Sequence, residues 1–494
     1  MCLLDFMLVI PEIFLLFGIF TILFFSIIYC LSSYGNFPFL YKNVNYLSIL
    51  LLICTFFLVI NSLDFISSSY IFLLNKSDYG NFTVILILAL SICVFIGSYF
   101  FNTYSRLQSF EYSVILLLTV LSLLLIVQTN NIFSFYLLLE FQSICLYVLA
   151  AYSSRETDSI EAGLKYFILG SFSSSFFLFG LVLLYGFTGL TFFEDLHFFF
   201  LTFIPSDYVL ICIETAIMLL TLGLLFKIYC VPFHFWVVDI YDGSPFSTTT
   251  FIACVPTLAM LYVFVKLYVT VFFEFIYIWE ILLFGASCFT MLFGAFGGIF
   301  QSKIKKIIAY SSITNVGYFL MCLVNSDFFS IHTGLLYFFI YIINLLGIFY
   351  IFSHIYINSI NTSIDTINLL CGFSKQNRFA AFSLSCLLFP SAGMPPFNPF
   401  FLKLFMFTNV INTSSYILIF IGLLCSILSC YFYIKIIKHM YYNIRNIWLT
   451  HIPIPYYACV FILLFVFFQL DEIFLPSIFD VFFSIMALDL YIYM

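Results

Sequence analysis

Long apolar runs, separated by short polar or turn-rich breaks, make up most of this chain. They lie near residues 8–31, 45–62, 82–101, 112–128, 131–152, 162–187, 208–243, 249–272, 276–299, 306–324, 329–355, 379–411, 415–437 and 456–470. One helical crossing of a bilayer core needs about 20 apolar residues. The pattern therefore predicts an all-α polytopic membrane protein with about 14 transmembrane helices.

Two of these runs, 208–243 and 379–411, are too long for a single crossing. Prolines interrupt them: Pro232 in the first, and Pro395, Pro396 and Pro399 in the second. Proline frees backbone groups that lipid cannot satisfy, so such breaks occur where the backbone is buried in protein or lines a wet cavity. We therefore expect broken seventh and twelfth helices. His234, just past the first break, is either a proton relay or a satisfied helix-end histidine.

The composition agrees with a membrane protein. Of the 494 residues, 64% are apolar and only 8% are charged, whereas soluble proteins carry about 25% charged residues. The net charge of -7 excludes a chain-wide basic surface for nucleic acid. The first apolar run has no basic segment before it and no small-residue cleavage site, so we expect a retained crossing rather than a signal peptide.

Residues that hold metals, iron–sulfur clusters or nucleotides are scattered along the sequence. The 15 cysteines stand singly in apolar runs, and the six histidines are equally dispersed. Zinc and iron–sulfur sites need such ligands at short spacing, and glycine-rich phosphate loops are absent from the sequence. We expect this chain to bind no metal, nucleotide or redox cofactor.

Basic residues of the predicted loops lie almost entirely on one side of the membrane. With the N-terminus on side one, side two holds Lys42, Arg106, Arg155, Lys303, Lys305, Lys306, Lys375, Arg378, Lys435, Lys438 and Arg445. Side one holds only Lys76. Loops rich in Lys and Arg face the inside, so both termini are expected outside. The acidic tail there contains Asp471, Glu472, Asp480 and Asp489.

The four basic residues not assigned to loops, Lys165, Lys227, Lys266 and Lys403, fall inside the predicted spans, as does Glu140. A charge at mid-membrane costs about 2.5–3.5 kcal/mol, and such residues usually line an ion or proton path. The alternative for each lysine is a side chain that snorkels from a helix end. Glu140 and Lys227 would form a proton switch if the fifth and seventh helices touch.

The two broken runs are related to each other. Lys227 precedes the break in the first, and Lys403 follows the break in the second, as expected of an inverted repeat. Spans four to eight and nine to thirteen would then be two inverted five-helix repeats. The expected divisions are 1–110 for helices 1–3, 111–272 and 273–440 for the two repeats, and 441–494 for helix 14 with the acidic tail.

Several stretches resemble a known family. They are 161–170 (EAGLKYFILG) continuing to residue 189, 226–245 (FKIYCVPFHFWVVDIYDGSP), 305–313 (KKIIAYSSI) and 392–403 (AGMPPFNPFFLK). Over residues 11 to about 445, the chain resembles the NADH dehydrogenase chain 2 family, the N-type antiporter-like subunits of respiratory complex I. Chains 4 and 5 and cation/proton antiporters share the lysine and proline elements, and the 161–189 block favours chain 2.

The resemblance implies a core membrane-arm subunit of NADH:ubiquinone oxidoreductase in the mitochondrial inner membrane. Such a subunit translocates protons, driven by quinone reduction elsewhere in the complex, and the matching positions here are Glu140, Lys165, Lys227 and Lys403. NADH, FMN, iron–sulfur clusters and ubiquinone would be bound by other subunits. The expected partners are the antiporter-like chain 4, the small chains 4L, 6 and 3, and lipids such as cardiolipin.

The chain departs from the family pattern at Thr257, where the family places a lysine. Lys266 lies nine residues further, about 900° of helical rotation, so it points to the opposite face. We expect ordered water beside Thr257, helped by Tyr262 or Tyr310, and we count Thr257, Lys266 and His234 among the proton-transfer candidates. Asn315 also replaces a family histidine. Two alternatives stay open: a membrane-arm spacer that does not pump, and a free-standing cation/proton antiporter.

Overall fold

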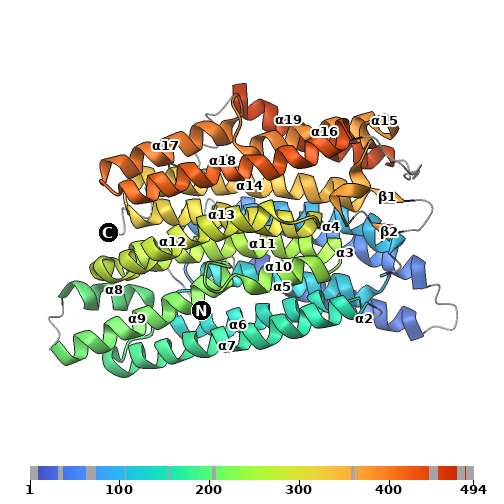
Figure 1. Cartoon of the computed structure of the whole chain (residues 1–494). Coiled ribbons are helices and arrows are strands. Elements are labelled where there is room, and N and C mark those ends of the chain that lie inside the picture. The colour runs from blue at the N-terminus through green and yellow to red at the C-terminus, as the bar shows by residue number, and fades with distance from the viewer. Residues whose placement is uncertain are drawn as a thin grey trace. The chain divides into compact units, whose positions relative to one another are not determined.

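The computed structural model is almost entirely helical (Figure 1). It describes residues 9–31, 37–62, 74–105, 107–153, 156–202, 207–357, 362–363, 365–443, 454–474 and 484. The chain forms two compact units. The first contains the described residues up to Lys227 together with Gly243–Trp279, and the second contains Ile228–Asp242 and the described residues from Glu280 onward.

The first unit is a helical bundle. Its elements are α2 (Ile10–Leu31), α3 (Phe37–Ser62), α4 (Asp78–Tyr104), α5 (Phe110–Gln128), α6 (Ile132–Ala150), α7 (Thr157–Thr188), α8 (Phe193–Thr202), α9 (Asp207–Lys227), α11 (Phe246–Val265), η1 (Lys266–Val271) and η2 (Phe273–Phe275). The π-helix η1 continues directly from α11. In the most apolar 18-residue window of Phe246–Val271, which the two elements form together, 94% of the residues are buried.

The second unit is built around two almost completely buried helices, α13 (Ile304–Val324) and α14 (Phe328–Ser353). Its other helical elements are most of α10 (Phe235–Gly243), most of α12 (Ile276–Ile299), η3 (Ile367–Leu370), α15 (Phe373–Gln376), α16 (Arg378–Ala392), α17 (Asn398–Asn412), α18 (Tyr416–Tyr441) and α19 (Tyr456–Phe474). The short strands β1 (Tyr356–Ile357) and β2 (Thr362–Ser363) pair antiparallel, and the sequence analysis did not predict them.

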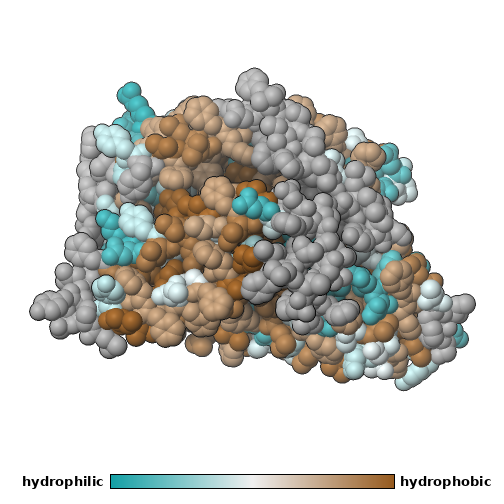
Figure 2. Space-filling view, turned by 180° about the vertical axis from the view of Figure 1, so that it is seen from behind, coloured by the Kyte–Doolittle hydropathy of each residue, from teal (hydrophilic) through white to brown (hydrophobic). Residues whose placement is uncertain are grey.

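The helical prediction is confirmed, since each of the fourteen apolar runs is helical. Twelve helices among the described residues are long enough and apolar enough to cross a membrane. The twelfth run is divided into the shorter helices α16 and α17, and the last run contains the apolar segment Ala458–Gln469 of α19. Figure 2 shows hydrophobic side chains over much of the coloured surface, as lipid-facing helices require.

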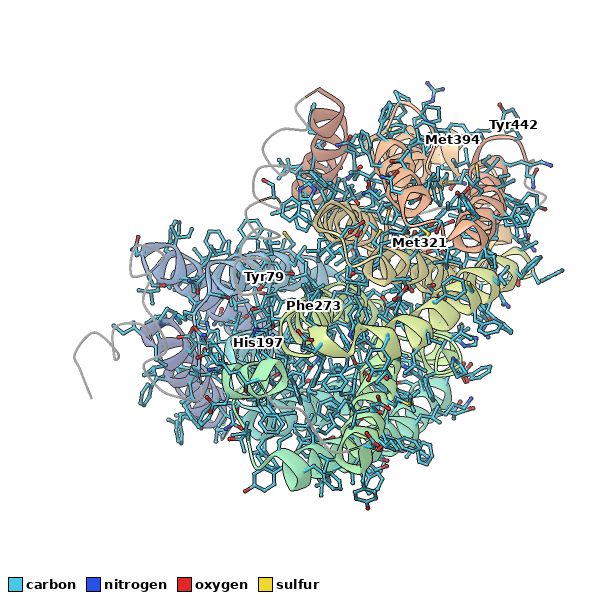
Figure 3. All side chains as sticks on the ribbon, turned by 90° about the vertical axis from the view of Figure 1, so that its left-hand side faces the viewer. Tyr79, His197, Phe273, Met321, Met394 and Tyr442 are labelled. Carbon is cyan, nitrogen blue, oxygen red and sulfur yellow. The ribbon has the colours of Figure 1, made fainter. Side chains whose placement is uncertain are left out.

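Both predicted helix breaks are present. Between α9 and α10, residues Ile228–His234 form turns that contain Pro232. In the second unit, α16 ends at Ala392 and is capped by Gly393, whose positive φ of 73° suits glycine and whose N–H donates to the Pro390 carbonyl. Pro395 and Pro396 follow in the break, near Met394 (Figure 3). Pro399 lies in the first turn of α17, so it starts the second half-helix rather than interrupting a helix.

Small residues allow α7 and α9 to approach closely in the first unit. A Cβ atom added at Gly223 would lie 2.8 Å from Cβ of Phe177, and one at Gly180 would lie 2.9 Å from the Ala216 carbonyl oxygen. Helices that pack in a membrane use such residues because backbones then meet at van der Waals distance. This close contact aligns Ser173 and Phe177 of α7 with the end of α9.

Loops assigned to the same membrane side meet within each unit. In the first unit, Lys76 forms an ion pair with Glu12 near the start of α2, at 3.0 Å. In the second, Thr413 donates to Asn325 at 2.9 Å, so the loops that follow α17 and α13 share one end. These contacts agree with the predicted number of crossings between the loops. The inverted repeats, the residue boundaries of the four divisions and the outside location of the termini stay predictions.

Arg106, Arg155 and Arg445 of the basic loops lie outside the described residues. Of the acidic tail, Asp471 and Glu472 belong to α19, whereas Asp480 and Asp489 lie outside the described residues.

Candidate functional site

Glu140 and Lys227 face one small cavity in the first unit. Glu140 comes from the middle of α6, and Lys227 is the last residue of α9. Between them the wall is formed by Ser173, Ser174 and Phe177 of α7 and by Gly223 of α9. The centre of a water molecule could move within a volume of about 10 Å³ in this cavity, so the cavity has room for about one water molecule.

The sequence explains why these two charges meet. Gly223 lies one turn before Lys227 and lets Phe177 of α7 pack directly on α9. The lysine ammonium lies at the C-terminal end of α9, where the helix dipole and the last carbonyl groups favour a cation. On α6, the hydroxyl of Ser143 donates to the Glu140 backbone carbonyl at 2.8 Å and lies 3.5 Å from the Glu140 carboxylate.

The two side chains interact electrostatically without a direct ion pair. Glu140 is the charged group that acts on Lys227, and both residues line the same cavity. The ammonium group only donates hydrogen bonds, whereas the carboxylate accepts them. A water molecule between them would accept from Lys227 and donate to Glu140, which is the geometry needed to pass a proton along a hydrogen bond. The two residues therefore line one cavity, and their action as a proton couple stays a prediction.

Lys403 has a different environment, inside the second unit. It lies in the second turn of α17 with only 6% of its surface exposed. Its Nζ atom lies 4.9 Å from the ring centroid of Tyr318 and 5.7 Å from that of Tyr337. Among the described residues, no carboxylate forms an ion pair with this lysine. The predicted placement after the helix break is confirmed, and its aromatic partners were not predicted.

Lys266 caps another helix instead of joining the Glu140 cavity. It is the first residue of η1, and its ammonium donates to the backbone carbonyl of Thr129 at 2.7 Å. Thr129 is the C-cap of α5, so the lysine neutralises the negative end of that helix. The ammonium also lies 5.6 Å from the ring centroid of Phe193 and interacts electrostatically with Glu194. Its proton-transfer role stays a prediction.

A buried ion pair lies at the same end of α5. Glu12 Oε1 accepts from Gln128 at 2.6 Å and pairs with Lys76 at 3.0 Å, and both charged side chains are less than 10% exposed. Sequence reasoning treated Lys76 as a loop residue and missed this pair. The available signal was that Lys76 is the one basic residue assigned to side one.

Three other candidates are not among the residues that line the Glu140 cavity. Lys165 is 44% exposed on α7 and pairs with Glu161 at 2.8 Å, one turn away. His234, in the turn before α10, is buried with its ring 5.8 Å from that of Phe293. Thr257 is buried in α11, and its hydroxyl donates to the Ala253 carbonyl of its own helix at 2.9 Å.

The two tyrosines proposed to assist Thr257 have other neighbours. The ring of Tyr262 packs against Tyr79 (labelled in Figure 3), with centroids 4.5 Å apart in the first unit. Tyr310 belongs to α13 in the second unit, where a Cβ atom added at Gly297 would lie 2.2 Å from its ring. The predicted water-filled space beside Thr257 stays a prediction.

Asp242, which was not among the sequence candidates, forms ion pairs with two basic residues in the second unit. Asp242 Oδ2 lies 2.8 Å from Nζ of Lys303 and 3.4 Å from Nζ of Lys306. In the sequence, Asp242 appeared only as part of the DIYDGSP stretch that follows the first break. These two ion pairs connect α10 with the start of α13.

Comparison with known proteins gives the family. Residues 129–429 match the family model described as NADH:quinone oxidoreductase/Mrp antiporter, transmembrane. NADH-ubiquinone oxidoreductase chain 2 of Marchantia polymorpha is 33% identical over 459 residues, covering 91% of each chain. NADH-quinone oxidoreductase subunit N of Pelagibacter ubique is 37% identical over 350 residues, covering 69% of this chain and 72% of its own.

Solved structures share the fold at low sequence identity. A chain of respiratory complex I from Thermus thermophilus with bound aureothin is 21% identical, with a TM-score of 0.74 over 94% of this chain and 98% of its own. A chain of the Mrp complex from Dietzia is 16% identical, with a TM-score of 0.81 over 98% of both chains. The match to more than half of the sequence and the relatives above 30% identity lead to one conclusion: this chain belongs to the NADH:quinone oxidoreductase/Mrp antiporter membrane family, among the chain 2 and subunit N proteins.

Proposed function

We propose that this chain is a proton-translocating membrane subunit of a respiratory NADH:quinone oxidoreductase. The single observation that carries the proposal is the cavity shared by Glu140 and Lys227. A carboxylate and an amine within reach of one water molecule exchange a proton when their mutual attraction changes. Quinone reduction in the assembled complex would supply that change, and the relatives named as oxidoreductase subunits support this assignment.

The redox chemistry belongs to other subunits in this proposal. NADH, FMN, the iron–sulfur clusters and ubiquinone would be bound elsewhere in the complex. The partners would be the antiporter-like chain 4 and the small chains 4L, 6 and 3, with lipids such as cardiolipin around them. The location would be the mitochondrial inner membrane, with both termini on the intermembrane-space side, as the loop charges indicate.

Within the chain, Glu140 and Lys227 would form the central proton couple. Lys403 would be a second proton-carrying group in the other unit. Lys165, Lys266, His234 and Thr257 remain candidates for the path. The first two already have local partners, which are Glu161 for Lys165 and the Thr129 carbonyl for Lys266. Lys266 is the weaker of these because its ammonium caps α5.

A non-pumping spacer is the second candidate function, and one observation favours it. The hydroxyl of Thr257 is used by carbonyl groups of its own helix, at 2.9 Å to Ala253 and 3.1 Å to Cys254. A hydroxyl engaged in this way relays protons less readily than a lysine, which stores one. The spacer would keep the complex assembled and active in quinone reduction, and proton translocation would be unaffected by changes at Lys227.

The test of the proposed function has two parts. Purification from native membranes should yield a large assembly with flavin and iron–sulfur subunits, and a solitary homo-oligomer would point to a free-standing antiporter. In sealed vesicles of the complex, Lys227→Ala should abolish this chain's share of proton translocation while quinone reduction with an uncoupler persists. Unchanged proton translocation by Lys227→Ala would favour the spacer.

A further inference from the structure

Two tyrosine rings enclose the ammonium group of Lys403. Tyr318 comes from α13 and Tyr337 from α14, and Lys403 enters between them from α17. The distances from Nζ to the ring centroids are 4.9 and 5.7 Å. The rings meet edge to face, with centroids 6.2 Å apart and an interplanar angle of 83°. Both tyrosines are at most 2% exposed, so the contact is fully desolvated.

The hydroxyl groups of both rings have other acceptors. Tyr318 donates to the Gly422 carbonyl of α18 at 3.0 Å, and Tyr337 donates to Oδ1 of Asn315 at 2.5 Å. The amide nitrogen of Asn315 donates in turn to the Ser311 carbonyl at 2.8 Å, which fixes the side chain. The rings are therefore held with their faces, rather than their hydroxyl groups, toward Lys403.

The helix break also lies against the ammonium group of Lys403. A Cβ atom added at Gly393 would lie 3.2 Å from Nζ of Lys403, so the ammonium packs against the glycine that ends α16. Its φ of 73° is a conformation that other residues adopt with strain. Backbone and two aromatic faces thus surround a cation that has no carboxylate ion pair among the described residues.

A π face attracts a cation through its quadrupole, and the attraction is strongest where water is excluded. Unlike a carboxylate, a tyrosine ring is neutral. When Lys403 releases its proton, a carboxylate partner would be left as an unpaired buried anion, whereas the aromatic faces leave no net charge behind. The two lysines proposed to carry protons would then differ in their partners, since Lys227 interacts with the Glu140 carboxylate and Lys403 with neutral rings.

We propose that Tyr318 and Tyr337 form an aromatic cage that positions the ammonium of Lys403 in place of a carboxylate. Asn315 is a positioning residue for Tyr337, and it stands where the family resemblance expects a histidine. The proposal rests on the proposed function, because it names the groups that hold one proton-carrying lysine. It predicts that aromatic character, not the hydroxyl group, is the property required at positions 318 and 337.

The experiment compares Phe and Leu at each position in vesicles of the whole complex. Tyr318→Phe and Tyr337→Phe keep a ring and should retain at least half of the wild-type proton translocation per quinone reduced. Tyr318→Leu and Tyr337→Leu should reduce this chain's share about tenfold, since they remove a desolvated cation–π contact. The matched control is Tyr350→Leu, a buried tyrosine of the same helix α14 whose ring packs against His354, which should translocate protons like the wild type.

Complex yield and uncoupled quinone reduction report assembly for every variant. Where a leucine variant does not assemble, the methionine variant, equally non-aromatic and longer, is measured with the same expectation. If the Phe and Leu variants at a position retained the same proton translocation, or lost it equally, the cage would be overturned. Lys403→Met separates the two proposals. Normal proton translocation by this variant would contradict the proposed role of Lys403. Loss of proton translocation in Lys403→Met, with normal translocation in both Leu variants, would contradict only the cage.

Discussion

At the scale of single residues, partners distinguish the lysines more than depth does. Lys227 shares a cavity with Glu140, Lys403 lies between aromatic rings, Lys266 caps α5 and Lys165 pairs with Glu161 on an exposed helix face. The sequence marks all four as charges inside apolar runs. Only the first two have surroundings suited to gaining and losing a proton, because the other two are held by fixed local acceptors.

Lys227→Arg tests whether the first of these lysines must lose its proton. Arginine keeps the positive charge and the donors but does not deprotonate in proteins. The variant should assemble and should lose as much proton translocation as Lys227→Ala, measured in sealed vesicles by a pH-sensitive dye. Lys306→Arg is the control, since it keeps the charge opposite Asp242. Wild-type translocation by Lys227→Arg would exclude a deprotonating lysine.

Sequence patterns identified the charged residues and could not identify their neighbours. The pairing of Glu140 with Lys227 was predicted only on the condition that two helices touch, and neither Tyr318 nor Tyr337 was expected beside Lys403. Tyrosine is common in this chain, with 35 copies, so one more in an apolar run carries no signal. Contacts between helices far apart in sequence depend on packing, which periodicity does not encode.

At the scale of helices, apolar length and proline were reliable guides. Both breaks were predicted, because a proline within an apolar run longer than one crossing indicates two half-helices. The short helix α8, the π-helix η1 and the β1–β2 hairpin were missed. These elements are set by loop packing and by hydrogen bonds such as that from Lys266 to Thr129, not by hydrophobic pattern.

Gly223→Ala tests whether the contact of α7 with α9 holds the cavity together. The added Cβ would lie 2.8 Å from Cβ of Phe177, so the helices must separate, at a cost of about 1–3 kcal/mol. We expect a lower temperature of thermal inactivation of the complex and reduced proton translocation. The matched control is Gly186→Ala on α7, where an added Cβ meets nothing within 4 Å. Equal behaviour of the two variants would contradict this packing argument.

At the scale of the whole molecule, two statements concern the chain: its family membership and its predicted orientation in the membrane. The family is established by the match over residues 129–429 and by relatives above 30% identity. The orientation stays a prediction, which rests on eleven basic loop residues on one predicted side and one on the other. Each of the two compact units holds one of the lysines proposed to carry protons, Lys227 in the first and Lys403 in the second.

Epitope tags test this orientation. A tag inserted beside Lys375, in α15, should be reached by antibody only from the inner side of the membrane. A tag beside Ser414, between α17 and α18, should be reached only from the outer side. Activity of the tagged complex confirms that each insertion is tolerated. Access to both tags from the same side, or from the reverse sides, would contradict the count of crossings or the assigned direction.

The central claim is that Glu140 and Lys227 act as one proton couple, and a double-mutant cycle measures this directly. Glu140→Gln, Lys227→Met and the double variant are compared by protons translocated per NADH oxidised in sealed vesicles. Two residues that work as a unit give non-additive losses. We predict that each single variant and the double variant lose the same share while uncoupled oxidation persists. A wild-type ratio in Lys227→Met, or losses that add in the double variant, would contradict the claim.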